Sequence, residues 1–223
     1  MERMIFADRR EAGKKLFLAL EERGFKKDTP VVFGIPRGGV VVADEVAAGL
    51  AVPMDVIIAR KLRAPNQPEL GIGAVISGDH ITIINEELAQ ATGATQSYLD
   101  REIALQRGEI ERRMKFYRGD RQATDVAGKT VIVVDDGIAT GYTFRAALEG
   151  LRRRQPQKLI AAAPVGAPDS TDMLRSFADE VICLSTPAHF MAVGAWYRNF
   201  DQTTDEEVAT ILRQNWEQFQ API

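Results

Sequence analysis

Short hydrophobic runs, rich in valine and isoleucine, alternate along the chain with segments whose apolar residues have helical spacing. Runs of about four to eight apolar residues between turn signals are typical of buried strands. Such runs cover residues 31–35, 54–59, 72–76, 81–84, 131–134, 159–163 and 181–184. Because buried strands that alternate with helices form parallel sheets covered on both faces, the pattern predicts an α/β protein with a parallel sheet flanked by helices.

Helical spacing and start signals place the intervening helices. They are expected at residues 39–49, 97–117, 143–154, 169–177 and 204–219. The last begins with a capping box formed by Thr204 and Glu207. Gly108 lies in the middle of the long helix, where glycine costs about 1 kcal/mol, and marks a candidate break. The two runs between residues 72 and 84 bracket a Ser-Gly-Asp turn and predict a hairpin inserted into the α/β pattern.

Composition places the chain among globular proteins that bury a core. Hydrophobic residues make up 45% of the 223 residues and charged residues 26%, which are ordinary values for a folded domain. The net charge of −3 supplies no overall basic field, which disfavours a nucleic-acid partner. Cys183 is the only cysteine, so an internal disulfide and a cysteine-rich zinc site are excluded. It is expected to be a buried small hydrophobe.

The N-terminal segment MERMIFADRREAGKK is charged throughout and lacks the apolar centre of a signal peptide. No run approaches the roughly 18 apolar residues of a membrane span. We therefore expect a cytoplasmic protein without a membrane partner. No internal repeat or interdomain linker is visible, so residues 1–223 are expected to form a single domain.

The segment VIVVDDGIATGYT, residues 131–143, holds the densest candidate chemistry. Asp135 and Asp136 follow an apolar strand, and ligands of open α/β sheets bind beyond the carboxyl ends of strands. The small residues after them lead into a helix, and backbone N–H groups at such a turn form an anion cradle. Two carboxylates would repel a phosphate and suit hydroxyl groups or a divalent cation, so a sugar phosphate meets both demands. The alternative is a plain turn with Thr140 or Thr143 as N-cap.

This segment resembles the phosphoribosyl pyrophosphate (PRPP) motif of the type I phosphoribosyltransferases: four hydrophobic residues, two acidic ones, and a small-residue loop ending in Thr-Gly-x-Thr/Ser. The resemblance implies that Asp135 and Asp136 are catalytic and hold the ribose 2′ and 3′ hydroxyls, while residues 139–143 wrap the 5′-phosphate. The other substrate-binding residues would be Gly137, Ile138, Ala139, Thr140, Gly141, Tyr142 and Thr143.

The same resemblance implies a Rossmann-like fold with a variable hood over the site. In the family's reaction a nitrogen nucleophile displaces pyrophosphate from C1 of PRPP. Mg²⁺ would be the cofactor, bound to pyrophosphate and ribose oxygens. Asp135 and Asp136 are the candidates for direct contact with the metal, and no dedicated set of metal ligands is assigned.

A pyrophosphate site is expected elsewhere, in the loop after the first predicted strand. The sequence GIPRGG, residues 34–39, has glycines that let the backbone approach an anion closely. It is not a Walker loop, because the Gly-Lys-Ser/Thr ending is missing, and a Pro-Arg-Gly-Gly turn alone is weak evidence. The family's pyrophosphate loop resembles it, and some members hold a cis peptide there. The resemblance implies that Pro36, Arg37, Gly38 and Gly39 bind pyrophosphate.

Arg60 and Lys61 end the second predicted strand, before residues 62–69, which are too polar and proline-rich for regular structure. They could be two solvated cations. The pair is similar to one in adenine and orotate phosphoribosyltransferases, where a mobile loop closes over PRPP and excludes water from an oxocarbenium-like transition state. This implies that Arg60 and Lys61 are catalytic and bind the leaving pyrophosphate, with Glu69 as a candidate contact for the nucleophile. Three strand ends would then deliver these groups to one edge of one sheet.

The sequence does not fix the nitrogenous acceptor. In the 6-oxopurine enzymes an acid occupies the position of Ala139, which argues against hypoxanthine and guanine. Adenine and uracil enzymes resemble this loop better, although Tyr142 replaces their usual small residue. The aromatic segment at 187–200 forms either satellite core under the C-terminal helix or a hood wall that stacks on a planar base. The two histidines, His80 and His189, are expected to be structural or exposed.

Over nearly the whole chain the sequence resembles a bacterial group of predicted phosphoribosyltransferases whose acceptor is not established. A helical insertion is expected at about residues 86–120 and a small hood at about 185–223. The expected function is Mg²⁺-dependent transfer of the 5-phosphoribosyl group from PRPP to a nitrogenous base or amine, in nucleotide salvage. The family is often dimeric, so a homodimer is a candidate state. The alternative is a noncatalytic PRPP-binding regulator, which would use a winged helix and a basic face.

Overall fold

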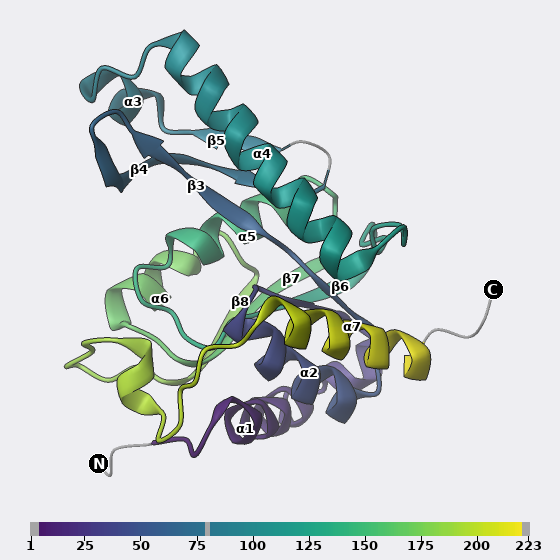
Figure 1. Cartoon of the computed structure of the whole chain (residues 1–223). Helices are drawn as coiled ribbons and strands as arrows, with labels where there is room; N and C mark the ends of the chain where they lie inside the picture. Colours follow the sequence, from purple (N-terminus) through teal and green to yellow (C-terminus); the bar gives the residue numbers. More distant parts are fainter. Residues whose placement is uncertain (1–4, 79–80, 220–223) are drawn as a thin grey trace.

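The computed structural model describes residues 5–78 and 81–219 and divides their strands between two sheets (Figure 1). The central sheet is parallel throughout, with the strand order β2-β1-β6-β7-β8. Its strands are β1 (Val31–Gly34), β2 (Met54–Val56), β6 (Thr130–Val134), β7 (Lys158–Val165) and β8 (Glu180–Ser185). Each overlaps a predicted run, so the predicted parallel sheet is confirmed.

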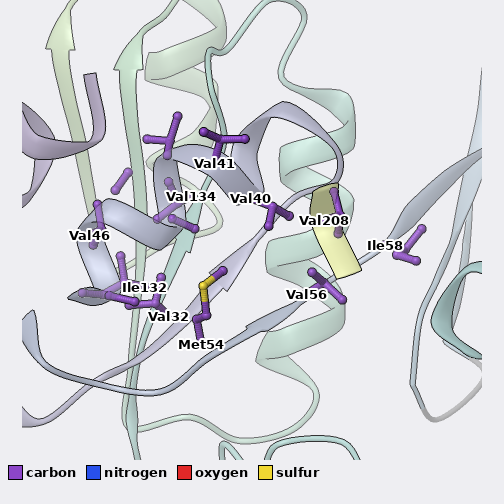
Figure 2. Close-up of a cluster of buried hydrophobic side chains, with 14 of the residues drawn as sticks. Val32, Val40, Val41, Val46, Met54, Val56, Ile58, Ile132, Val134 and Val208 are labelled. Atoms are coloured by element: carbon purple, nitrogen blue, oxygen red, sulfur yellow. The ribbon is translucent and has the colours of Figure 1, made fainter. Parts of the chain in front are cut away.

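Helices cover both faces of the central sheet because successive strand residues point to opposite sides. Val32 and Val134 lie in a core with α1, α2 and α7, whereas Val31 and Val133 pack with α5 and α6. Figure 2 shows part of the first core, with side chains from β1, β2, β6, α2 and α7. The helices are α1 (Arg9–Glu22), α2 (Gly38–Leu50), α5 (Tyr142–Arg152), α6 (Pro168–Leu174) and α7 (Asp205–Phe219).

The predicted helices are present, with shifted ends. Helix α6 ends at Leu174, earlier than predicted, and Glu207 N donates to Thr204 Oγ1 at 3.1 Å at the start of α7, as a capping box requires. Helix α1 is an addition to the prediction, with Asp8 as N-cap. A short 3₁₀ helix, η1 (Phe25–Asp28), follows it. None of the described helices is long and apolar enough to cross a membrane.

The second sheet and the helices after it form a unit that we call the arm (Figure 1). Its antiparallel strands are β3 (Ala59–Ala64), β4 (Gln67–Ile76) and β5 (Thr82–Ile84), and its helices are α3 (Glu86–Ala91) and α4 (Gln96–Arg118). The β4–β5 pairing confirms the predicted hairpin, although Asp79 and His80 lie outside the described residues. Helix α4 runs unbroken through Gly108, because Leu99 and Ile110 on either side are buried in one core.

Two sequence expectations fail at the arm. The run at 54–59 is not one strand: β2 ends at Val56 in the central sheet, and Ala59 begins β3 in the other. Residues 62–69 were expected to be irregular, yet they lie mostly in β3 and β4. Pro65 sits with Asn66 (φ 60°) in the turn that links the paired residues Ala64 and Gln67, and Pro68 lies near the start of β4, where the pairing register shifts. Cross-strand pairing thus overrides the polar composition.

Candidate active site

The acidic pair, Asp135 and Asp136, lies directly after β6 at the carboxyl edge of the central sheet, and both residues are half-buried. Asp135 Oδ1 accepts a hydrogen bond from the backbone N–H of Asp136 at 2.8 Å. The backbone N–H of Asp135 donates to the carbonyl of Ala162 on β7 at 3.3 Å. The sheet therefore fixes the backbone from which both carboxylates project.

The glycine loop, residues 34–39, packs against this pair. A Cβ added at Gly38 would lie 1.9 Å from Asp136 Oδ2, and one at Gly39 would lie 2.8 Å from the Cα of Asp135. At Gly39 the near atoms include backbone, so only glycine fits, whereas at Gly38 they are the ends of the Asp136 and Arg9 side chains, which a Cβ would displace. The peptide bond between Pro36 and Arg37 is cis. The structure therefore brings together two segments that the sequence predicted separately.

Helix α2 begins in the glycine loop without a side-chain cap, and α5 begins in the same way at Gly141. The first N–H groups of a helix have no intrahelical acceptor and attract anions. Gly141 adopts φ 74°, a left-handed conformation that favours glycine. The idea that Thr140 or Thr143 caps α5 is wrong, because Gly141 is the N-cap and no side chain bonds the helix start.

The 137–143 loop is anchored at its base and exposed at its tip. The backbone N–H of Ile138 donates to Val165 at 2.9 Å, and the carbonyl of Ile138 accepts from Ala167 at 2.8 Å. The Ser170 hydroxyl donates to the carbonyl of Ala139 at 2.6 Å. Ala139, Thr140, Tyr142 and Thr143 are exposed, and Tyr142 keeps 68% of its surface in solvent. The loop can thus present its backbone and hydroxyl groups to a ligand.

Arg9, on the first turn of α1, is the counter-ion of the acidic pair. Its Nε lies 2.7 Å from Asp136 Oδ2, with the side chains 12% and 15% exposed respectively. One guanidinium nitrogen donates to the carbonyl of Asp201 at 2.6 Å, and the guanidinium carbon lies 3.8 Å from the centre of the Phe200 ring. The sequence does not point to Arg9, because Arg9 is 127 residues from Asp136 and nothing in its local pattern marks it.

Burial shapes the electrostatics of the pair. It raises the pKa of the Asp135 carboxyl well above its ordinary value, and the neighbouring Asp136 charge raises it further. Burial also raises the pKa of the Tyr197 hydroxyl, with the Asp136 charge as a smaller cause. That hydroxyl donates to the Asp136 carbonyl at 2.6 Å. An acidic pair of this kind can accept hydrogen bonds from sugar hydroxyls, because its oxygens are hydrogen-bond acceptors.

Arg60 and Lys61 lie on β3 of the arm rather than on the edge of the central sheet. The expectation that three strand ends meet at one edge of one sheet is therefore wrong, because the chain leaves the central sheet after β2. The backbone N–H of Ile57 still donates to the carbonyl of Gly34 at 3.2 Å. Arg60 is three residues after Ile57, and three residues span at most about 11 Å. The Cα atom of Arg60 therefore lies within about 11 Å of the Cα atom of Ile57.

Beside Arg60 lies a cavity of about 240 Å³, lined by Ala59, Arg60, Lys61, Arg63 and Gln106. Lys61 Nζ donates to the carbonyl of Glu69 at 2.7 Å and lies 3.6 Å from its carboxylate. Glu69 is therefore a neighbour of Lys61, and its side chain is fully exposed. Arg63 and Gln106 join this group without having been singled out in the sequence.

The hood segment packs beside α1. The 3₁₀ helix η2 (Val193–Trp196) places Val193 so close that a Cβ at Gly137 would lie 2.5 Å from it. Trp196 and Tyr197 are buried with Phe6 in a small core. The interpretation of this segment as satellite core under the C-terminal helix is thus wrong in its location, because the core adjoins α1. His189 is exposed, as expected.

The described residues contain no group of three or more His, Cys, Asp or Glu side chains that could hold a metal ion. Cys183 is half-buried rather than fully buried.

A model of the phosphoribosyl transferase domain matches residues 9–197 of the chain. The matched range includes Arg9, the glycine loop, the arm, the acidic pair and the hood through Tyr197. The chain therefore belongs to the phosphoribosyltransferase family, which confirms the resemblance found in the sequence.

Relatives match nearly the whole chain. The crystal structure of TT1426 from Thermus thermophilus is 43% identical and has a TM-score of 0.83, with 95% of this chain and 99% of that chain covered. Rv0571c from Mycobacterium tuberculosis, classed by name among the phosphoribosyl transferases, is 42% identical over 208 residues, which are 93% of this chain and 46% of the relative. The chain thus spans about half the length of this curated relative.

Proposed function

We propose that the protein is an enzyme that transfers the 5-phosphoribosyl group from PRPP to a nitrogenous base or amine and releases pyrophosphate. One observation carries the proposal: Gly38 and Gly39 pack directly on Asp135 and Asp136. A hydroxyl-binding acidic pair and an anion-binding loop are thereby in contact. The uncapped starts of α2 and α5 follow adjacent parallel strands, so they flank this point.

In the proposed complex, each part of PRPP meets the group that suits its chemistry. Asp135 and Asp136 accept hydrogen bonds from the ribose 2′ and 3′ hydroxyls. The 137–143 loop and the start of α5 bind the 5′-phosphate. Residues 36–39 and the start of α2 bind the pyrophosphate, to which Arg60 and Lys61 of the arm contribute positive charge.

The transfer step needs orientation and charge stabilisation. The acceptor nitrogen donates its lone pair to C1 of the ribose, and the bond from C1 to the pyrophosphate oxygen breaks with its electron pair on the leaving group. The acceptor then loses its proton to water. Negative charge grows on pyrophosphate as that bond breaks, so the cations of the arm act most strongly in the transition state.

The residues present fit Mg²⁺, because carboxylate and phosphate oxygens are the ligands that this cation prefers. Asp135 and Asp136 are the residues that would contact it, alongside oxygens of PRPP. Bound there, the metal would neutralise part of the pyrophosphate charge.

The acceptor is expected to be a base other than hypoxanthine or guanine, because Ala139 offers no acid to such a ring. Ala139 is exposed at the loop tip, and an alanine side chain cannot accept a hydrogen bond. The setting that we propose is nucleotide salvage in the cytoplasm, since joining a free base to a phosphoribosyl group makes a nucleotide.

The test combines binding and turnover. We expect the wild-type protein to bind PRPP with Mg²⁺ in isothermal titration, and to release pyrophosphate with at least one member of a panel of bases and amines. Failure to bind PRPP would contradict the proposal. PRPP binding without pyrophosphate release across a broad panel would contradict the proposed enzymatic activity and favour a PRPP-binding regulator.

A further inference from the structure

Two arginines of β3, Arg60 and Arg63, reach the same helix although regular strand alternation would separate them. Residues three apart on a regular strand point to opposite faces. The pairing register of β3 with β4 shifts on both sides of Arg63, and such an irregularity re-aims a side chain. Arg60 Nε donates to Gln106 Oε1 at 2.9 Å, and Arg63 Nε donates to Glu102 Oε1 at 2.8 Å. The irregular strand thus directs both guanidinium groups to α4.

The partners on α4 are buried polar side chains one helical turn apart. Glu102 is 6% exposed and Gln106 is 3% exposed. Glu102 also accepts from a terminal nitrogen of Arg63 at 3.1 Å and from Gln106 Nε2 at 3.0 Å. Burial opposes the ionisation of Glu102, but the hydrogen bonds from Arg63 and Gln106 outweigh it and lower the pKa of this carboxyl. Buried and bonded in this way, the two side chains hold both arginines in one arrangement.

The charges of this cluster do not balance. Arg60, Lys61 and Arg63 line the cavity of about 240 Å³ together with Gln106, and two acids oppose these three cations: Glu102 beside Arg63 and the fully exposed Glu69 beside Lys61. Gln106 orients Arg60 through a neutral amide, so it fixes the guanidinium without cancelling its charge. A cavity with a surplus of fixed positive charge suits an anion, and planar guanidinium groups match phosphate oxygens.

We infer that Glu102 and Gln106 are positioning residues, through which α4 holds Arg60 and Arg63 as a preformed binding site for a diphosphate anion. The inference rests on the proposed function for the identity of that anion, which would be the pyrophosphate group of PRPP. It adds Arg63 to the ligand-binding residues. It also replaces the mobile loop expected at 62–69 with a paired strand whose cations are ordered before the ligand arrives.

Two nearly isosteric variants separate positioning from simple electrostatics. Gln106→Glu keeps the shape, opposes the charge of Arg60 and sets a second carboxylate against Glu102 in place of the amide donor, so it should weaken binding of inorganic pyrophosphate about tenfold. Glu102→Gln removes a negative charge, so electrostatics alone would tighten pyrophosphate binding. If Glu102 positions Arg63, the same variant weakens it, again by about tenfold.

The measurement is isothermal titration of the full chain with inorganic pyrophosphate, with ribose 5-phosphate as the control ligand. The matched control is Glu109→Gln on the same helix, because Glu109 pairs with Arg112 and Arg113 outside the cavity. We expect this control to bind pyrophosphate like the wild type. A merely structural role would lower the affinity for both ligands, whereas positioning lowers that for pyrophosphate alone.

Unchanged or tighter pyrophosphate binding in Glu102→Gln would overturn the inference, as would equal loss of both ligands. If Glu102→Gln fails to fold in a thermal melt, the neutral variant Gln106→Met decides the question, because it removes the acceptor of Arg60 Nε without adding charge. Pyrophosphate binding that is unchanged in Gln106→Met would then overturn the inference. The proposed function fails separately, when the wild-type protein does not bind PRPP. If the wild-type protein binds PRPP and neither α4 variant changes the affinity for pyrophosphate, only this inference is refuted.

Discussion

The edge of the central sheet and the arm are built on opposite principles. At the sheet edge, the acidic pair and two helix starts are held by backbone: parallel strands, glycines in close contact, and N–H groups without side-chain caps. In the arm, cations are held by other side chains, with Arg60 bonded to Gln106 and Arg63 to Glu102. At the sheet edge the acidic pair suits hydroxyl groups, and the helix starts beside it suit phosphate groups. The arm cluster carries surplus positive charge and suits a diphosphate.

This difference shows which interactions hold the functional groups of each region in place. A site made by backbone follows from a few adjacent residues, so it depends little on distant side chains. A site made by side-chain pairs depends on residues 39 and 46 positions apart. Substitutions should therefore act through local geometry at the sheet edge and through partner loss in the arm.

The largest effect is expected at the acidic pair. Replacing Asp135 and Asp136 together by asparagine should lower the affinity for PRPP about 100-fold or more, because each hydrogen bond to a charged group contributes about 1.5–3 kcal/mol. Isothermal titration with Mg²⁺ measures it, with a thermal melt as the folding control. An unchanged dissociation constant would remove the acidic pair from the site.

Arg9 tests whether the sheet edge also depends on one side-chain pair. Arg9→Gln leaves Asp136 without its partly buried counter-ion and should lower the free energy of unfolding by about 2 kcal/mol at pH 7. Thermal or urea unfolding measures this change. In an Asp136→Asn background the same substitution should cost much less, as coupled pairs show in a double-mutant cycle. Equal cost in both backgrounds would mean that the pair contributes nothing.

Gly38 tests the close contact between the glycine loop and the Asp136 side chain. Gly38→Ala would place a Cβ 1.9 Å from Asp136 Oδ2, displace that carboxylate, and weaken PRPP binding about tenfold. Gly108→Ala in α4 is the matched control, because no atom lies within 4 Å of its added Cβ. The control should bind PRPP normally and stabilise the helix by about 1 kcal/mol. Normal PRPP binding by Gly38→Ala would show that the contact is dispensable.

The smallest effect concerns pH and follows from the raised pKa of Asp135. A carboxyl whose pKa is higher in the folded state than in the unfolded one destabilises the fold when it ionises, so its contribution worsens as pH rises from about 4 through the raised pKa. Asp135→Asn removes this cost. The variant should gain on the order of 1 kcal/mol at pH 8 and almost nothing at pH 4, as measured by urea unfolding. If the gain in the free energy of unfolding does not grow with pH, the inferred upward shift of the Asp135 pKa is contradicted.

The parts of the molecule that the sequence could predict are those that depend on neighbouring residues. The strand at 131–134, the acidic pair and the small-residue loop are contiguous, so their pattern predicts the sheet edge. The glycine loop is likewise predicted from its sequence as an anion-binding turn. Its contact with the acidic pair is not predictable from the sequence. Local composition and spacing are sufficient there because the backbone builds the site.

The parts that the sequence could not predict depend on distant partners. In the sequence Arg9 is one of many charged residues near the N-terminus. Only the fold places its Nε 2.7 Å from Asp136 Oδ2. Glu102 and Gln106 read as polar positions of a helix, yet both are buried against the arm. The prolines and polar residues of 62–69 predict irregular structure. The segment is nevertheless extended, because β3 and β4 pair with each other there.

The division of the ligand between the two regions is tested most directly by titrating fragments of PRPP into two variants. One carries Asp135→Asn and Asp136→Asn, and the other carries Arg60→Gln in the arm. We predict that the first variant loses affinity for ribose 5-phosphate by about tenfold or more and still binds pyrophosphate, while the second loses affinity for pyrophosphate and still binds ribose 5-phosphate. If both fragments instead weaken in the same variant, or neither weakens in either, the division is contradicted.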